Sequence, residues 1–400
     1  MRTLLTFSII CCIIILYNIY EEDINMSSKF ELTISVDYVS DWGLYQALRE
    51  FIQNGLDEEV QNPNNKFFFN YDENNQTLTL GNKCSVLNID SLLLGVTTKN
   101  SDTHTIGQFG EGYKIATVVC LRTGHPVTFY NYGAREVWTT KLVKSRRFGG
   151  KLVPTFYVDK SFPWKSVPDN DLTIVIENIN LQEYLDVQEQ VLHFRTKPIL
   201  SLDCDSYGRI LLEDEFKGKV FVSGLYVCKN DRLNYGYDIT PEYLQLDRDR
   251  QTVSDFNLMW TTSRMWTYHI QNPLFLPLFY SNNPSDVCYL DSMYTFQEHL
   301  PYVTAEFYNK FGDGAIPVST QTELDKVKSL GGKPTVVSVP VANCLKSLYV
   351  EFLETHSPKQ TCYDVLQKWF QTLKESVPVP EILVSQFQDI LEEYEDVLKE

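Results

Sequence analysis

Hydrophobic residues recur at helical spacing between residues 44 and 60, in the segment LYQALREFIQNGLDEEV. Positions three and four residues apart lie on one side of a helix, so the pattern predicts a helix with a buried face. Glu50, Asn54 and Asp57 stand at positions i, i+4 and i+7, which places a carboxylate and an amide one turn apart on a second face. A solvated polar face would show the same spacing. The predicted buried face consists of Leu44, Ala47, Leu48, Phe51 and Ile52.

The hydrophobic pattern changes farther along the chain. Between residues 205 and 250, GRILLEDEF and GKVFVSGLYVC combine β-branched and aromatic residues with glycines, which predicts strands. Residues 315–340 predict a strand, a helix ended by two glycines and a second strand, together a small α/β unit. Residues 380–400 predict an amphipathic helix, which we expect to pack on its own domain rather than on a partner. The apolar positions of this helix are Ile382, Leu383, Phe387, Ile390, Leu391, Tyr394 and Leu398.

A mostly apolar run occupies residues 4–16, preceded by Arg2. Its length is typical of the hydrophobic region of a signal peptide and short for a membrane-spanning helix. No small-residue cleavage site follows it. Two expectations stay open: translation starts at Met26 and the protein is cytoplasmic, which we favour, or residues 1–20 anchor the chain in a membrane or export it.

The chain carries 52 acidic and 35 basic residues, which gives a formal net charge of −17. An acidic surface repels the phosphate backbone, so we expect no direct nucleic-acid binding without a partner. With 43% hydrophobic and 13% aromatic residues, the chain can form the cores of two or three domains. The nine cysteines include no C-x-x-C pair and the histidines show no zinc-like spacing, which indicates buried thiols in a reducing compartment.

Three glycines, Gly107, Gly110 and Gly112, stand in the segment TIGQFGEGYKIATVVC, residues 105–120, ahead of an apolar run. Glycine lets the backbone approach another group closely, and the N–H groups at the start of a helix favour phosphate. The segment lacks the G-x-x-x-x-G-K-[ST] of a P-loop, and its glycine order differs from the Rossmann fingerprint. It therefore suggests a phosphate-binding turn of another type, although a purely structural turn would have the same spacing.

Three segments taken together resemble the ATP-binding fold of the GHKL group, the Bergerat fold of gyrase-type topoisomerases, heat-shock chaperones, histidine kinases and MutL-type repair proteins. They are the E-x-x-x-N-x-x-D of the first helix, LGVTTKN at 94–100 and IGQFGEGYKIA at 106–116. The resemblance covers about residues 30–180, and its layout is closest to the chaperone, repair and gyrase members. It implies ATP as the ligand and Mg²⁺ as the metal.

The resemblance also implies roles for single residues. Glu50 matches the general base of ATP hydrolysis, and Asn54 matches the ligand of Mg²⁺. The glycines match the lid that wraps the phosphates, and the TTK segment precedes it as T-S-K does in repair and chaperone members. The further residues expected near the nucleotide are Asp57, Thr98, Lys99, Gly107, Gly110, Gly112, Lys114 and Thr173.

One family motif has no counterpart in this chain. The family places D-x-G-x-G between helix and lid, and its aspartate recognises the amino group of adenine; the corresponding segment here is LTLGNKCSVL, residues 78–87. Asn82 can accept the same hydrogen bond, although a neutral amide oxygen accepts less strongly than a carboxylate. Asp90 is the second candidate.

The segment LQLDRDR, residues 244–250, is similar to the L-x-L-x-x-R motif of the chaperones, whose arginine contacts the γ-phosphate. The similarity implies Arg248 or Arg250 as a catalytic cation that stabilises charge during phosphoryl transfer. A surface run of alternating charges would have the same appearance.

These observations predict an α+β protein. Residues 1–25 form a leader or anchor, 27–200 a GHKL ATP-binding α/β sandwich built on a mixed sheet, 201–275 an α/β transducer-like domain, and 276–400 a mixed C-terminal region. The expected function is Mg²⁺-dependent ATP hydrolysis that drives a conformational clamp, with an ATP-dependent homodimer. The alternative is a nucleotide-binding sensor or assembly module with little or no turnover. The sequence does not indicate the client.

Overall fold

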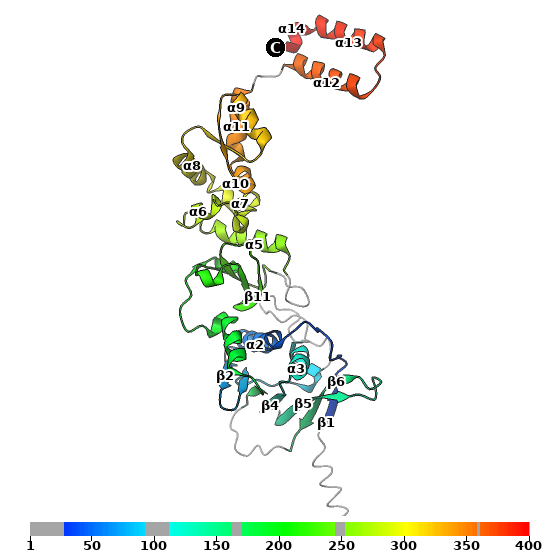
Figure 1. Ribbon diagram of the computed structural model, residues 1–400, viewed down its shortest axis with the longest axis vertical. Coiled ribbons are helices and arrows are strands. Elements are labelled where there is room, and N and C mark those ends of the chain that lie inside the picture. Colours follow the sequence, from blue (N-terminus) through cyan, green and yellow to red (C-terminus); the bar gives the residue numbers. More distant parts are fainter. Residues whose placement is uncertain (1–27, 93–111, 162–169, 245–252, 358–360, 400) are drawn as a thin grey trace, which may run out of the picture. The chain divides into compact units, whose positions relative to one another are not determined.

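The computed structural model describes residues 28–92, 112–161, 170–244, 253–357 and 361–399. The chain divides into two compact units: the first comprises residues up to 278 together with 284–289, and the second comprises 279–283 and 290–400. Both contain helices and strands, and the strands pair mostly antiparallel (Figure 1). The α+β class expected from the sequence is therefore confirmed.

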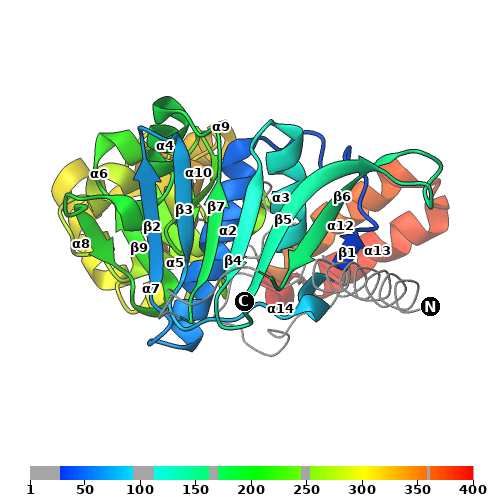
Figure 2. The same ribbon diagram turned by 90° about the horizontal axis from the view of Figure 1, so that it is seen from below.

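The first unit contains a seven-stranded sheet in the order β1-β6-β5-β4-β7-β3-β2, which Figure 2 shows along the front of the unit. Every neighbouring pair is antiparallel, so the expectation of a mixed sheet is wrong. Strands joined by short turns pair as hairpins, as β2–β3, β4–β5 and β5–β6 do. The strands are β1 (Ser28–Glu31), β2 (Phe67–Asp72), β3 (Thr77–Asn82), β4 (Val127–Asn131), β5 (Glu136–Lys144), β6 (Leu152–Asp159) and β7 (Leu172–Ile176).

Two helices, α2 (Leu44–Gln61) and α3 (Gly112–Arg122), lie side by side and pack on this sheet (Figure 1). The apolar stripe of α2 faces the sheet, where the ring of Phe51 lies 6.1 Å from that of Phe129 on β4. Most of α3 is apolar and buried, because it packs between α2 and the sheet strands β4, β5 and β6. The helix expected at 44–60 is thus confirmed.

A five-stranded sheet follows in the same unit, in the order β11-β10-β12-β9-β8, and it confirms the strands expected between residues 205 and 250. Its β10–β12 pair is parallel and the other pairs are antiparallel. The fully buried Asp286 accepts hydrogen bonds from the backbone and side chain of Asn234 and from the hydroxyl of Tyr237, so it ties residues 284–289 to β12. The elements are β8 (Ser201–Asp203), β9 (Gly208–Leu211), β10 (Lys219–Val222), β11 (Leu225–Lys229), β12 (Gly236–Ile239) and α5 (Asp255–Thr267).

In the second unit, β13 (Ala315–Val318) and β14 (Lys333–Val336) pair in parallel, and α9 (Gln321–Ser329) connects them. This is the strand-helix-strand unit expected at 315–340. Apolar residues of β13, α9 and α11 form its core. The remaining helices are α7 (Tyr294–Gln297), α8 (Leu300–Phe311), α10 (Val339–Cys344), α11 (Lys346–His356), α12 (Cys362–Ser376), α13 (Glu381–Glu393) and α14 (Glu395–Lys399); α6 (Phe275–Phe279) contains residues of both units.

Among the helices of the described residues, none has the length and apolar character needed to span a membrane. The apolar run at residues 4–16 lies outside the described residues, so the expectations about the N-terminus stay predictions.

Candidate functional site

The polar face of α2 is buried. Glu50 is 1% exposed, and Arg49, Gln53 and Asp57 on the same helix are also buried. Burying charged and amide groups costs free energy unless partners compensate them. A solvated polar face, the alternative interpretation of the i, i+4, i+7 spacing, is therefore excluded for Glu50 and Asp57.

Helix α3 begins directly against this face. A Cβ built on Gly112, the first residue of α3, would lie 2.7 Å from Nδ2 of Asn54 and 3.0 Å from Oε2 of Glu50. Only a residue without a Cβ permits so close an approach. The structure thus brings together two groups that the sequence pointed to separately, the polar pair on α2 and the last glycine of the glycine-rich segment. The first-turn N–H groups of α3, which have no partner within the helix, begin at this place.

Arg49 supplies positive charge beside Glu50. Its Nη2 lies 3.6 Å from Oε1 of Glu50, and both side chains are buried. The guanidinium also lies over the ring of Trp42, 5.7 Å from the ring centroid. A cation at this distance offsets part of the desolvation cost of a buried carboxylate.

The helix itself orients the amide of Asn54. Its Nδ2 donates to the backbone carbonyl of Glu50 (2.7 Å), and Oδ1 is the opposite end of the amide. An amide oxygen is a ligand that Mg²⁺ accepts, and this ion usually completes its shell with water and substrate phosphates. Among the described residues, no group of three or more His, Cys, Asp or Glu side chains is arranged to hold a metal. The donors present fit a Mg²⁺ held largely by the phosphates of a ligand.

Lys114, in the first turn of α3, is almost fully buried. Its Nζ donates to the carbonyl of Ser91 (2.8 Å) in the 3-10 helix η1 (Ile89–Leu92). The side chain therefore joins α3 to η1. It also adds a positive charge near the amino end of α3, where the helix dipole already favours anions.

The candidates for adenine recognition lie at the end of β3 and just beyond. Nδ2 of the buried Asn82 donates to the carbonyls of Gly55 on α2 (2.8 Å) and Asn65 (2.9 Å). Both hydrogens of the amide are therefore used in hydrogen bonds to the backbone. Asp90 is exposed on η1. Thr173 of β7 is half-buried and pairs with Gly81 of β3. The roles of all three in binding adenine stay predictions.

Two side chains that sequence analysis missed fix the loop after β3. The buried Asp171 accepts from Nζ of Lys83 and from the N–H of Cys84. The buried Asn131 exchanges two hydrogen bonds with the backbone of Leu87, at 2.6 and 3.3 Å. The only sequence signal was their position as polar residues at the ends of apolar strands, which is a common position for turn residues.

Six of the predicted site residues lie outside the described residues. They are Thr98, Lys99, Gly107, Gly110, Arg248 and Arg250. Their roles stay predictions.

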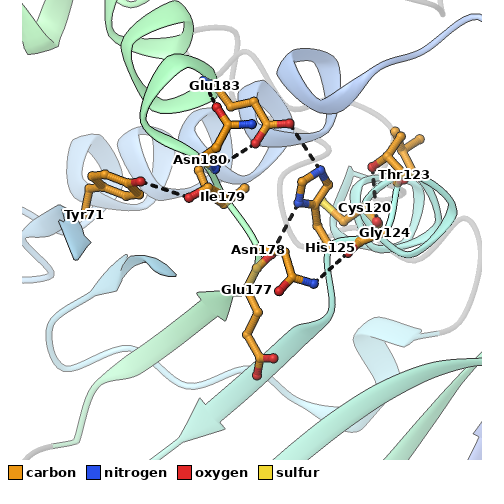
Figure 3. A network of polar contacts seen from close by, with 11 residues as sticks. Tyr71, Cys120, Thr123, Gly124, His125, Glu177, Asn178, Ile179, Asn180 and Glu183 are labelled. Carbon is orange, nitrogen blue, oxygen red and sulfur yellow. Dashed lines mark hydrogen bonds and ion pairs between the residues drawn. The ribbon is translucent and has the colours of Figure 1, made fainter. Parts of the chain in front are cut away.

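A network of polar contacts lies at the other end of α3 (Figure 3). Nδ1 of His125 lies 3.3 Å from the carbonyl oxygen of Glu177, and Nε2 lies 3.7 Å from Oε1 of Glu183. Glu183 is part of the capping box of α4 (Leu181–Glu189), in which Oδ1 of Asn180 accepts from the N–H of Glu183. The network therefore joins the end of α3 to the beginning of α4.

Arg122, in the last turn of α3, holds the loop that precedes α2. Nη1 donates to the carbonyls of Val36 and Tyr38, and Nη2 donates to those of Val39 and Trp42. A guanidinium has five N–H donors in a fixed fork, which suits a loop that presents several carbonyls to one point. Helix α3 is thus fixed at Gly112 and at Arg122.

Comparisons with known proteins give distant similarities. No curated protein matches this chain. The model of one family, described as the Mycoplasma pneumoniae MPN635 N-terminal domain, matches residues 182–267. Among solved structures, the ATPase region of Saccharomyces cerevisiae topoisomerase II is similar with 13% identity and a TM-score of 0.27; the match covers 46% of this chain and 62% of that chain. The ATPase and transducer domains of DNA topoisomerase II from Balamuthia mandrillaris are similar with 14% identity and a TM-score of 0.29, over 46% of this chain and 60% of that chain. This chain therefore spans less than two thirds of either structure.

Proposed function

We propose that this protein binds ATP with Mg²⁺ where α3 begins against α2, and that it hydrolyses the nucleotide slowly as a GHKL-type ATPase. The observation that carries the proposal is the close approach of Gly112 to Glu50 and Asn54. This approach brings a buried carboxylate, an amide and the amino end of a helix together. The resemblance to the GHKL group assigns these groups to ATP hydrolysis.

Glu50 is the general base in this proposal. Its carboxylate accepts a proton from the water that attacks the γ-phosphate, while the first-turn N–H groups of α3 hold phosphate oxygens. Asn54 would hold the metal through Oδ1, the end of the amide opposite the Nδ2 that donates to the carbonyl of Glu50. When bound, Mg²⁺ neutralises charge on the phosphates.

The other predicted residues complete the site in the same proposal. Lys114 adds positive charge, Asp57 lies one turn beyond Asn54, and Thr173 with Asn82 or Asp90 borders the adenine. Arg248 or Arg250 reaches the γ-phosphate from the second sheet region. The residues proposed for the lid around the phosphates are Thr98, Lys99, Gly107, Gly110 and Gly112.

The test is Glu50→Gln in the chain from Met26 to Glu400. We expect phosphate release to fall at least about a hundredfold with nucleotide affinity retained, because a general base contributes about 10²–10⁴-fold to the rate. Glu58→Gln is the matched control: it removes one charge two turns farther along α2, where Glu58 accepts hydrogen bonds from Asn62 and Asn65. Equal activity in Glu50→Gln and wild type would remove Glu50 from this role.

For the biological role we propose an ATP-driven conformational clamp in the cytoplasm, in which ATP closes the lid and brings two protomers together. The alternative is a nucleotide sensor or assembly module with little turnover. The missing family aspartate favours this alternative, because the neutral amide oxygen of Asn82 accepts a hydrogen bond from adenine less strongly than a carboxylate would.

Phosphate release and mass in solution, measured with ATP, ADP and a non-hydrolysable analogue, separate these roles. Release together with analogue-dependent dimerisation supports the clamp. Tight binding without either supports the sensor. A protein that binds none of the three nucleotides would contradict both.

A further inference from the structure

The second unit ends in a helical hairpin, here called the C-terminal hairpin, formed by α12 and by α13 with α14 over residues 361–399. Its two arms meet at Phe387 of α13. The ring of Phe387 stacks on Phe370 of α12, with centroids 3.9 Å apart, and lies 6.4 Å from the ring of Trp369. Leu391, one turn beyond Phe387, is buried. The expected helix at 380–400 therefore packs within its own unit, on α12.

This packing covers only part of the apolar surface. Trp369, Leu383, Ile390 and Tyr394 are each 50–55% exposed. Leu383 and Ile390 stand four before and three after Phe387, so they lie on the same side of α13 as that ring, and Tyr394, the C-cap residue of α13, stands seven after it. Trp369 reaches the same side from α12, since it contacts Phe387. Together these four residues form an apolar strip along the hairpin, here called the hairpin strip.

Acidic residues accompany the hairpin strip. Residues 361–399 carry eight Asp and Glu against three Lys, and the exposed acids on α13 and α14 include Asp389, Glu392, Glu393 and Asp396. Two copies of this hairpin would bring like charges together, in a chain whose net charge is already −17. The same charges repel an anionic membrane surface.

We propose that the hairpin strip binds a basic amphipathic helix of a partner protein, which packs as a third helix against α12 and α13. Anchors at spacing i, i+7 and i+11, as at residues 383, 390 and 394, extend over about 17 Å, the length of three helical turns. Apolar side chains of the partner helix cover the strip, and its Lys and Arg side chains meet acids at the edge of the strip, among them Glu393, three residues after Ile390. This inference does not depend on ATP binding by the first unit.

The test uses the full chain and a labelled peptide of about 18 residues. Leu occupies one face of this peptide and Lys the other when it forms a helix. A peptide of the same composition in scrambled order and a peptide with Glu in place of Lys are the controls. We expect only the amphipathic basic peptide to bind tightly, measured by fluorescence anisotropy. Hydrogen exchange should then show new protection in residues 362–398.

Variants locate the binding. Trp369→Ala and Ile390→Ser should each weaken binding at least about tenfold, as central apolar anchors do. Val336→Ser is the matched control, because Val336 is 67% exposed on β14 and lies outside the hairpin. Hydrogen exchange of the free variants shows whether the hairpin stays folded. If Trp369→Ala unfolds the hairpin, Ile390→Ser still tests the proposal, because Ile390 is half-exposed.

Four outcomes would overturn the proposal. The first is equal binding of the scrambled or the acidic peptide, and the second is unchanged peptide affinity in both hairpin variants. The third is protection of the hairpin from hydrogen exchange by phosphatidylglycerol vesicles in place of the peptide. The fourth is a dimer of the free chain that Ile390→Ser dissociates. The third would assign the strip to membranes, and the fourth would assign it to a second copy.

Discussion

Replacing Gly112 with alanine should reduce nucleotide turnover while the protein stays folded. The added methyl group would lie 2.7 Å from Nδ2 of Asn54 and 3.0 Å from Oε2 of Glu50. An ordinary contact needs at least 3.4 Å, so a side chain must move by about 0.7 Å. Misplacing a catalytic group by 1 Å costs about a hundredfold in rate, so we expect a loss of at least about tenfold.

Stability should change little, because two effects oppose each other. Alanine is better than glycine by up to about 1 kcal/mol in a helix, and by less at its first residue, whereas overpacking costs about 1–3 kcal/mol. The φ of Gly112 lies outside the left-handed region, so alanine adds no backbone strain. The free energy of unfolding, measured in urea, should therefore fall by about 0–2 kcal/mol.

The assay compares phosphate release and the affinity for a fluorescent ATP analogue in Gly112→Ala, Gly43→Ala and wild type. Gly43 precedes α2 with a φ of −101°, and its added methyl group would meet no atom closer than 3.5 Å. Gly43→Ala should therefore keep turnover and affinity. Wild-type values for both quantities in Gly112→Ala would refute the inference that the start of α3 and Glu50 belong to one site.

Two further predictions concern buried polar groups of the first unit. Asn82→Ala should lower the free energy of unfolding by about 2–4 kcal/mol, because the carbonyls of the buried Gly55 and the half-buried Asn65 lose their donor. Asn74→Ala in the exposed β2–β3 turn should cost under about 0.5 kcal/mol, and equal costs of the two variants in urea unfolding would contradict the structural role of Asn82. Burial raises the pKa of Asp286 above its usual value of 3.8, so the folded state binds its proton more tightly than the unfolded state does. The stability that this proton contributes is fully present below the pKa of the unfolded state and is lost as the pH rises through the pKa of the folded state. The free energy of unfolding of Asp286→Asn should therefore fall less steeply than that of the wild type between these two pKa values. An equal pH dependence of both proteins would show that burial does not perturb Asp286.

Local patterns allowed part of the molecule to be predicted. The apolar stripe of α2 follows from spacing within one helix, and Gly112 stood out because glycines cluster in the sequence. The strand-helix-strand unit at 315–340 was also visible, since its capping residues and glycines lie next to the elements they end. In each case the signal and the structure it specifies are only a few residues apart.

Long-range pairings could not be predicted in the same way. Asp171 pairs with Lys83 across 88 positions, and Asp286 pairs with Asn234 across 52, so neither partner marks the other in the sequence. Asn82 illustrates a second problem: its residue type suggested a ligand contact through Oδ1, whereas no local pattern indicated that its amide hydrogens would bind the backbone carbonyls of Gly55 and Asn65. Whether a polar side chain serves the fold or a ligand depends on neighbours that only the folded chain supplies.

Helix α3 is held near both of its ends, by Lys114 and by Arg122, and it therefore links the segments at its two ends rigidly. Its 11 residues span about 16 Å, and its internal hydrogen bonds keep that length fixed. We therefore expect a displacement of Gly112 along the helix axis to move Arg122 as well, which donates to the carbonyls of Val36, Tyr38, Val39 and Trp42. The same displacement reaches His125 and, through Glu183, the first turn of α4. We therefore expect an event at the start of α3 to move two segments that do not touch Gly112.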